Sequence, residues 1–133
     1  MIDIEAAVFS RISKAYDEKY PNGSRYGEPT DTPANFPCLT LVEIDNYTYG
    51  QSLTAELKEH HAWVVYEVNV YSNSINGAKQ ECKEIIKLVD TEMQQLGFKR
   101  MFLNQTKNTD TRIYRITARY RGVVSENYRI YKK

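Results

Sequence analysis

The sequence predicts an α+β fold: an antiparallel-rich sheet of about four to five strands, two helices packed on one face of it, and a long loop or arm. Two segments repeat apolar residues at helical spacing, and several others alternate apolar and polar residues as half-buried strands do. The 133 residues, 41% of them hydrophobic and 26% charged, are enough for one core. We therefore expect residues 1–133 to form a single domain.

The first helix is expected between residues 2 and 20, with Asp3 as its N-cap and the Pro21-Asn22-Gly23 turn after it. Its predicted buried stripe consists of Ile4, Ala7, Val8, Arg11, Ile12, Ala15 and Tyr16. Residues 21–37 hold all four prolines of the chain and predict a long loop. Long loops in compact domains often make contacts with partners.

The next elements are predicted to be two strands joined by an arm. Residues 38–47 are rich in β-forming side chains, whereas residues 48–61 have no clear period and suggest an extended arm or a wide hairpin loop. Residues 62–72 alternate most regularly. The face predicted to be buried there carries Val64, Tyr66, Val68 and Val70, and Glu67 and Asn69 mark the other face.

A second amphipathic helix and a hairpin complete the predicted fold. Ser74 is a candidate N-cap, and Gly97 stands where a left-handed residue ends a helix. The apolar face between them comprises Ala78, Cys82, Ile85, Ile86, Val89, Met93 and Leu96. Residues 98–105 and 112–124 predict an antiparallel hairpin, and residues 126–133 a short edge strand. The strands before and after this helix could also be parallel neighbours, so the sheet order stays open.

Four arginines fall within residues 112–121. At a period of two, the helix-facing side would hold Tyr114, Ile116, Ala118 and Tyr120, and the outer side Arg115, Thr117, Arg119 and Arg121. A sheet that stacks nucleic-acid bases exposes its aromatic rings beside basic residues. Here these tyrosines are predicted to be buried, although Tyr71 and Trp63 could share the outer face. A solvated or protein-contacting face is the first interpretation, and nucleic-acid contact the second.

The overall charge and the apolar runs limit the possible partners. The formal net charge is +1, so no global field attracts nucleic acid or an anionic membrane. The apolar runs are too short to cross a bilayer, and the first residues do not resemble a signal peptide. We expect synthesis in the cytoplasm and no membrane partner. Eleven tyrosines suggest a contact surface without naming the partner.

Candidate catalytic or metal-binding groups are few. The adjacent His60 and His61 point opposite ways on an extended chain, so a weak cation site with Glu56 and Glu59 is improbable. No phosphate loop, CxxC, HExxH or serine elbow occurs in the sequence. Glu43 and Asp45 are predicted to share a strand face, most simply a solvated one.

Cys38 and Cys82 are expected to be buried free thiols. We therefore expect no catalytic residue, no cofactor and no metal, and hence no enzyme.

From about residue 35 onward the chain resembles the tail terminator proteins of tailed bacteriophages, also called tail completion or head–tail joining proteins. Four motifs carry the resemblance: an "NFP" segment before a strand, a "VYS"-like strand end, an "LGF" helix end and an arginine-rich "YR-TARY" strand. The matching residues are Asn35, Phe36 and Pro37; Val70, Tyr71 and Ser72; Leu96, Gly97 and Phe98; and Tyr114, Arg115, Thr117, Ala118, Arg119 and Tyr120.

The resemblance implies a virion assembly protein without enzymatic activity. Such proteins form a ring, typically a hexamer, on the head-proximal end of the tail tube, where they stop polymerisation and dock the head connector. The implied partners are further copies of the chain, the tail tube protein and the head–tail connector protein. Position and chemistry suggest these interface residues: Tyr49, Leu53, Leu57, Arg115, Arg119 and Arg121. The alternatives are a neighbouring connector or stopper protein and a small nucleic-acid-binding module.

Overall fold

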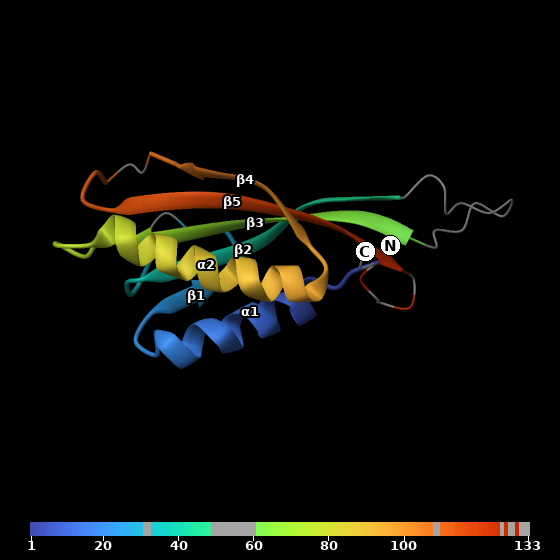
Figure 1. Cartoon of the computed structure of the whole chain (residues 1–133), viewed down its shortest axis with the longest axis horizontal. Coiled ribbons are helices and arrows are strands. Elements are labelled where there is room, and N and C mark those ends of the chain that lie inside the picture. The colour runs from blue at the N-terminus through green and yellow to red at the C-terminus, as the bar shows by residue number, and fades with distance from the viewer. Residues whose placement is uncertain (31–32, 49–60, 108–109, 126, 128–129, 131–133) are drawn as a thin grey trace, which may run out of the picture.

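The computed structural model has two helices and one five-stranded sheet (Figure 1). It describes residues 1–30, 33–48, 61–107, 110–125, 127 and 130. The elements are α1 (Glu5–Lys19), β1 (Ser24–Tyr26), β2 (Cys38–Thr48), β3 (His61–Ser72), α2 (Ala78–Leu96), β4 (Lys99–Gln105) and β5 (Tyr114–Ser125). The strand order is β1-β2-β3-β5-β4, and among the described strands only β1 and β2 pair in parallel.

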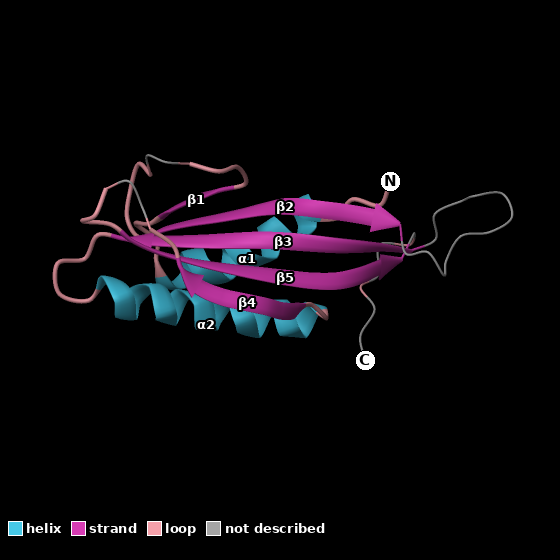
Figure 2. Ribbon diagram, turned by 90° about the horizontal axis from the view of Figure 1, so that it is seen from above, coloured by secondary structure: helices cyan, strands magenta, loops and turns pink. Residues whose placement is uncertain are grey.

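Both helices cover the same face of the sheet, and the opposite face is turned away from them (Figures 1 and 2). The predicted α+β class, the mainly antiparallel sheet and the packing of both helices on one side are confirmed. A single core lies between the two layers. Its largest fully buried side chains include Ile12, Tyr16, Leu39, Leu41, Tyr66, Ile85, Met93, Phe98 and Tyr120.

The buried stripe of α1 is narrower than the sequence predicts. Val8, Ile12 and Tyr16 are buried at a spacing of four, whereas Ala7 and Arg11 are exposed. Because only two helices cover the sheet in the described part of the chain, α1 presents a broad side to solvent. The helix begins at Glu5 with Ile4 in the N-cap position.

Asp3 lies one residue before that N-cap position but still caps the first turn. Its Oδ1 accepts a hydrogen bond of 3.0 Å from the Glu5 amide. One of the amide groups left without a partner at the start of α1 is thereby satisfied.

The two ends of α2 differ in how well the sequence predicts them. Gly97 has a φ of 107°, which confirms the left-handed helix end. The predicted N-cap at Ser74 is wrong, because the helix begins at Ala78 after Gly77. The Ser72 hydroxyl at the end of β3 donates a 2.6 Å hydrogen bond to Glu81 in the first helical turn and accepts another from the Ser74 amide. Ser72 thus connects the strand to the helix.

The predicted loop over residues 21–37 contains the short strand β1. Three residues are too few to show a period, and β1 exists through its pairing with β2, which joins Ser24 to Cys38. The Pro37 carbonyl anchors this edge, accepting hydrogen bonds from the Tyr16 hydroxyl (2.6 Å) and the Ser24 amide (3.0 Å).

The hairpin of β4 and β5 is confirmed, and the alternative of parallel neighbours around α2 is wrong. The strands before and after α2, β3 and β4, run in the same direction, but β5 lies between them and pairs with both. Most of the edge strand predicted over residues 126–133 lies outside the described residues. Ile130 forms an isolated antiparallel bridge with Val124.

Candidate protein-interaction surface

The face of the sheet opposite the helices, here called the outer face, carries the predicted arginines. The register pairs Tyr71 with Arg115, Asn69 with Thr117, Glu67 with Arg119 and Val65 with Arg121. Directly paired residues of an antiparallel ladder project to the same side. Tyr120, Ala118 and Ile116 alternate with them and are buried under the helices. The predicted division of residues 114–121 into two faces is therefore confirmed.

Two of the arginines are built into a hydrogen-bonded network on this face. Asn69 Oδ1 accepts hydrogen bonds from Arg115 Nε (3.0 Å) and from the Thr117 hydroxyl (2.6 Å). Asn69 Nδ2 donates to Glu67 (3.1 Å), and the other Glu67 oxygen accepts from Arg119 Nε (2.9 Å). Arg115 and Arg119 are half-buried, and their guanidinium groups are partly occupied by hydrogen bonds to residues of β3.

Aromatic rings support the arginines from below. Each guanidinium carbon lies within cation–π distance of a ring centroid. The pairs are Arg115 with Tyr71 at 5.2 Å, Arg119 with Phe102 at 5.0 Å and Arg121 with Trp63 at 4.3 Å. Each arginine is thus held in a defined position.

Arg121 differs from the other two arginines. Its side chain is exposed, and among the described residues no carboxylate lies within ion-pairing distance of it. The residue paired with it on β4 is Lys99, another cation. Of the three predicted interface arginines, Arg121 has the most capacity left for an external carboxylate.

Among the described residues, three large apolar side chains on the strands are exposed. Tyr47 pairs with Trp63 on the outer face and is 42% exposed. Ile44 and Met101, 42% and 52% exposed, are each the additional residue of a β-bulge, in β2 and β4 respectively. Bulges re-aim side chains and occur next to functional sites. These bulges could not be predicted, because the alternation of apolar and polar residues does not reveal an inserted residue.

The bulge at Ile44 corrects the expected carboxylate pair. Glu43 pairs with Tyr66, which faces the helices, and Asp45 pairs with Val65 on the outer face. The two carboxylates therefore lie on opposite faces of the sheet and not on one.

Glu43 lies against the beginning of α1, where its amide donates to Glu5 Oε2. Burial above all raises the pKa of the Glu43 carboxyl, the Glu5 carboxylate raises it further, and a hydrogen bond from Asn46 opposes them.

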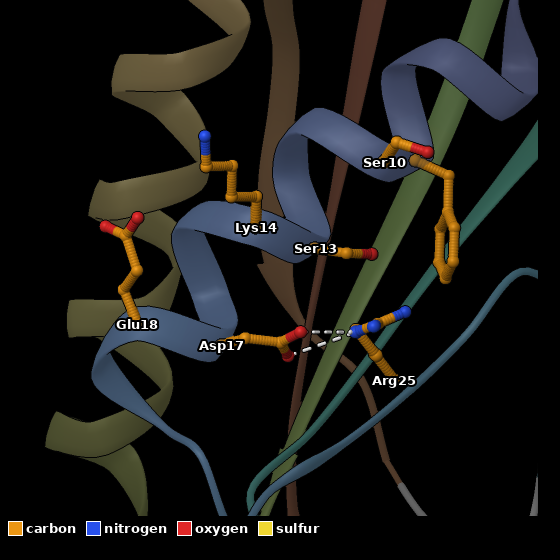
Figure 3. Close-up of a pocket in the computed structure, with 7 residues that line it drawn as sticks. Ser10, Ser13, Lys14, Asp17, Glu18 and Arg25 are labelled. Carbon is orange, nitrogen blue, oxygen red and sulfur yellow. Dashed lines mark hydrogen bonds and ion pairs between the residues drawn. The ribbon is translucent and has the colours of Figure 1, made fainter.

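A hollow lies between α1 and β1 (Figure 3). Its walls include Phe9, Ser13, Asp17 and Arg25. The Arg25 guanidinium binds Asp17, with Nε 3.0 and 3.1 Å from the two carboxylate oxygens, and lies 5.7 Å from the Phe9 ring centroid. Because Asp17 already neutralises Arg25, this arginine has less capacity left for an external carboxylate than Arg121 has.

The remaining candidate groups are buried or outside the described part of the chain. Cys38 and Cys82 are free and buried, as predicted, and burial raises the pKa of the Cys82 thiol to about 12. Glu56, Glu59 and His60 lie outside the described residues. Within the described ranges, His, Cys, Asp and Glu form no group of three that could hold a metal ion.

The structure brings together half of the predicted interface set. Arg115, Arg119 and Arg121 lie in one row of the outer face. Tyr49, Leu53 and Leu57 lie outside the described residues, so they stay predictions. Sequence reasoning missed the role of Asn69 and Glu67 as partners of the arginines, although the alternation that puts them on one face with Trp63 and Tyr71 contained the signal.

Comparison with known proteins adds no family. The sequence matches no protein-family model, and no curated protein matches it significantly. Within the described residues, neither helix is both long and apolar enough to cross a membrane.

Proposed function

We propose that this chain is a structural virion assembly protein that forms a ring on the head-proximal end of a phage, or phage-like, tail tube. The ring would stop tube polymerisation and present the surface to which the head docks. The "NFP", "VYS", "LGF" and "YR-TARY" motifs support this proposal through their resemblance to tail terminator proteins. The role requires no catalytic group and no cofactor.

The observation that carries the proposal is the chemistry of the outer face. Tyr47, Trp63 and Arg121 lie on a face that the helices leave uncovered. Aromatic residues and arginine are the side chains most enriched at protein interfaces. A rigid sheet also holds such residues in place with little loss of conformational entropy on binding.

A ring requires two different surfaces on each subunit, because a head-to-tail contact repeated about an axis closes on itself. The outer face is one such surface, and the helix layer on the opposite side is chemically distinct from it. Arg121 is the arginine we assign to the contact with a neighbouring subunit or with the tube. Arg119 is less suited to this role, since Glu67 already neutralises it.

The test is assembly of the Arg121→Glu variant. We expect it to fold but to lose ring formation on tail tubes, because like charges across an interface cost several kcal/mol. Purified tail tube protein would be polymerised with each variant, and tube lengths would be measured by negative-stain electron microscopy.

Arg112→Glu is the matched control, because Arg112 is 87% exposed in the turn before β5. It should limit tube length as the unmodified chain does. Tubes limited equally well by Arg121→Glu would contradict the assignment of Arg121.

The nucleic-acid alternative is less well supported by the same contacts. Arg115 and Arg119 are bonded within the sheet, and their rings lie beneath guanidinium groups. A base-stacking surface needs free ring faces.

A further inference from the structure

A groove opens where α2 leads into β4, at the border of the outer face. Its volume is about 630 Å³. Strand β4 begins at Lys99, which pairs with Arg121. The last residues of β5, after Arg121, therefore have no partner on β4. The side chains that matter for binding are Trp63, Lys99, Arg100, Met101, Arg121 and Val123.

The groove is cationic. Lys99 and Arg121 are directly opposite each other in the ladder, an arrangement of like charges that is unfavourable without an anion between or above them. The third cation of the groove, Arg100, forms an ion pair of 2.7 Å with Asp90 of α2. Asp90 is shared, because its other oxygen accepts a hydrogen bond from the buried Tyr120 hydroxyl. None of the described residues that line the groove is acidic.

The groove is also apolar. Met101 is 52% exposed at the bulge of β4, and Trp63 and Val123 are half-buried beside it. Phe98, only 1% exposed, forms the floor. Its ring packs so closely on Gly122 that a Cβ there would lie 2.5 Å from Phe98 Cδ1. The floor is therefore fixed.

We propose that this groove binds an acidic peptide segment of a partner protein. An apolar side chain of the segment packs against Met101, Val123 and the exposed part of Trp63. A neighbouring carboxylate forms a charge-assisted pair with Arg121, whose planar fork suits it, and relieves the repulsion from Lys99.

This inference deepens the proposed function by naming the chemistry of a partner. It rests on that function only in taking the partner to be another protein of the particle. Binding by the isolated chain does not depend on that point.

A nucleic acid fits the groove less well. Bases bind to proteins by stacking on free aromatic faces. The Arg121 guanidinium already lies 4.3 Å from the Trp63 ring centroid and covers one face of that ring. The exposed Met101 and the half-buried Val123 suit an apolar side chain better than they suit a phosphate.

Trp63 is the only tryptophan of the chain, so its fluorescence reports directly on the groove. The probe is an end-blocked peptide, Asp-Glu-Leu-Phe-Asp-Glu, titrated into the full chain. We expect a saturable change in Trp63 emission that weakens as salt is added. Arg121→Gln should weaken binding at least about tenfold, the loss of one charged hydrogen bond, and Lys99→Gln should weaken it less. Arg112→Gln, with the same loss of charge, should bind as the unmodified chain does.

The inference would be overturned by no saturable change with the acidic peptide, by equal binding of its Asn-Gln-Leu-Phe-Asn-Gln counterpart, or by tighter binding of oligodeoxythymidylate than of the peptide. Equal weakening by Arg112→Gln would also overturn it. If the peptide fails to bind while the chain still limits tube length, the inference alone is lost. If the peptide binds but tubes are not limited, the proposed function is lost and the groove remains.

Discussion

At the scale of single residues, the outer face shows why an arginine-rich strand is difficult to interpret from sequence. Alternation correctly separates Arg115, Thr117, Arg119 and Arg121 from the buried tyrosines. It cannot show which arginines already form hydrogen bonds within the sheet. Those hydrogen bonds come from Asn69 and Glu67 of β3, which lie beside β5 only in the folded sheet.

Asn69 is the residue that joins this network, and its removal should be costly. Asn69→Ala removes the acceptor that Arg115 and the Thr117 hydroxyl share. Thr117, only 7% exposed, then keeps only the contact of its hydroxyl with the Thr106 hydroxyl. Loss of a buried hydrogen-bond partner costs about 1–3 kcal/mol. We expect the free energy of unfolding in urea to fall by this amount.

Asn104→Ala is the matched control for this prediction. Asn104 pairs with Thr117 from the other side, on β4, but is exposed, so its replacement should change the free energy of unfolding by less than about 0.5 kcal/mol. Equal effects of the two substitutions would show that the network contributes nothing to stability.

At the scale of elements, the sequence predicted well those helices and strands that are long and periodic. It did not predict β1, because three residues acquire their conformation from pairing with β2. It did not predict the bulges at Ile44 and Met101, since an inserted residue resembles ordinary sequence. Nor did it show that β5 separates β3 from β4. These features depend on long-range pairing, which composition and period do not encode.

The junction of α1 and β2 predicts a pH dependence of stability. The pKa of Glu43 is raised in the folded chain above its ordinary value of 4.5, chiefly by burial and then by Glu5. The folded state therefore holds this proton more tightly than the unfolded chain does. The stabilisation from Glu43 is complete below pH 4.5 and is lost as the pH rises through the folded pKa.

Glu43→Gln should remove this dependence. The free energy of unfolding of the variant minus that of the unmodified chain should be larger at pH 7 than at pH 4. Both chains would be unfolded in urea at both pH values. Glu18→Gln on the exposed side of α1 should show no such difference. A Glu43→Gln effect that is the same at both pH values would contradict the raised pKa.

At the scale of the whole molecule, the two faces of the sheet have different roles. The helices close one face of the sheet and form the core with it, so the other face is available for contacts. The resemblance in motifs suggests a tail terminator, and the aromatic residues, Arg121 and the groove beside β4 suit a protein that binds other proteins. Which neighbour occupies which face could not be predicted from this sequence, because complementarity belongs to the partner as well.

The most direct test of the central claim is electron microscopy of particles from a strain that lacks the gene, with a complemented strain as control. The account predicts tails of irregular and excessive length beside filled heads that have no tail, and normal particles after complementation. Tails of normal length that fail to join heads would assign the chain to a connector on the head side. Intact, infectious particles would contradict the structural role altogether.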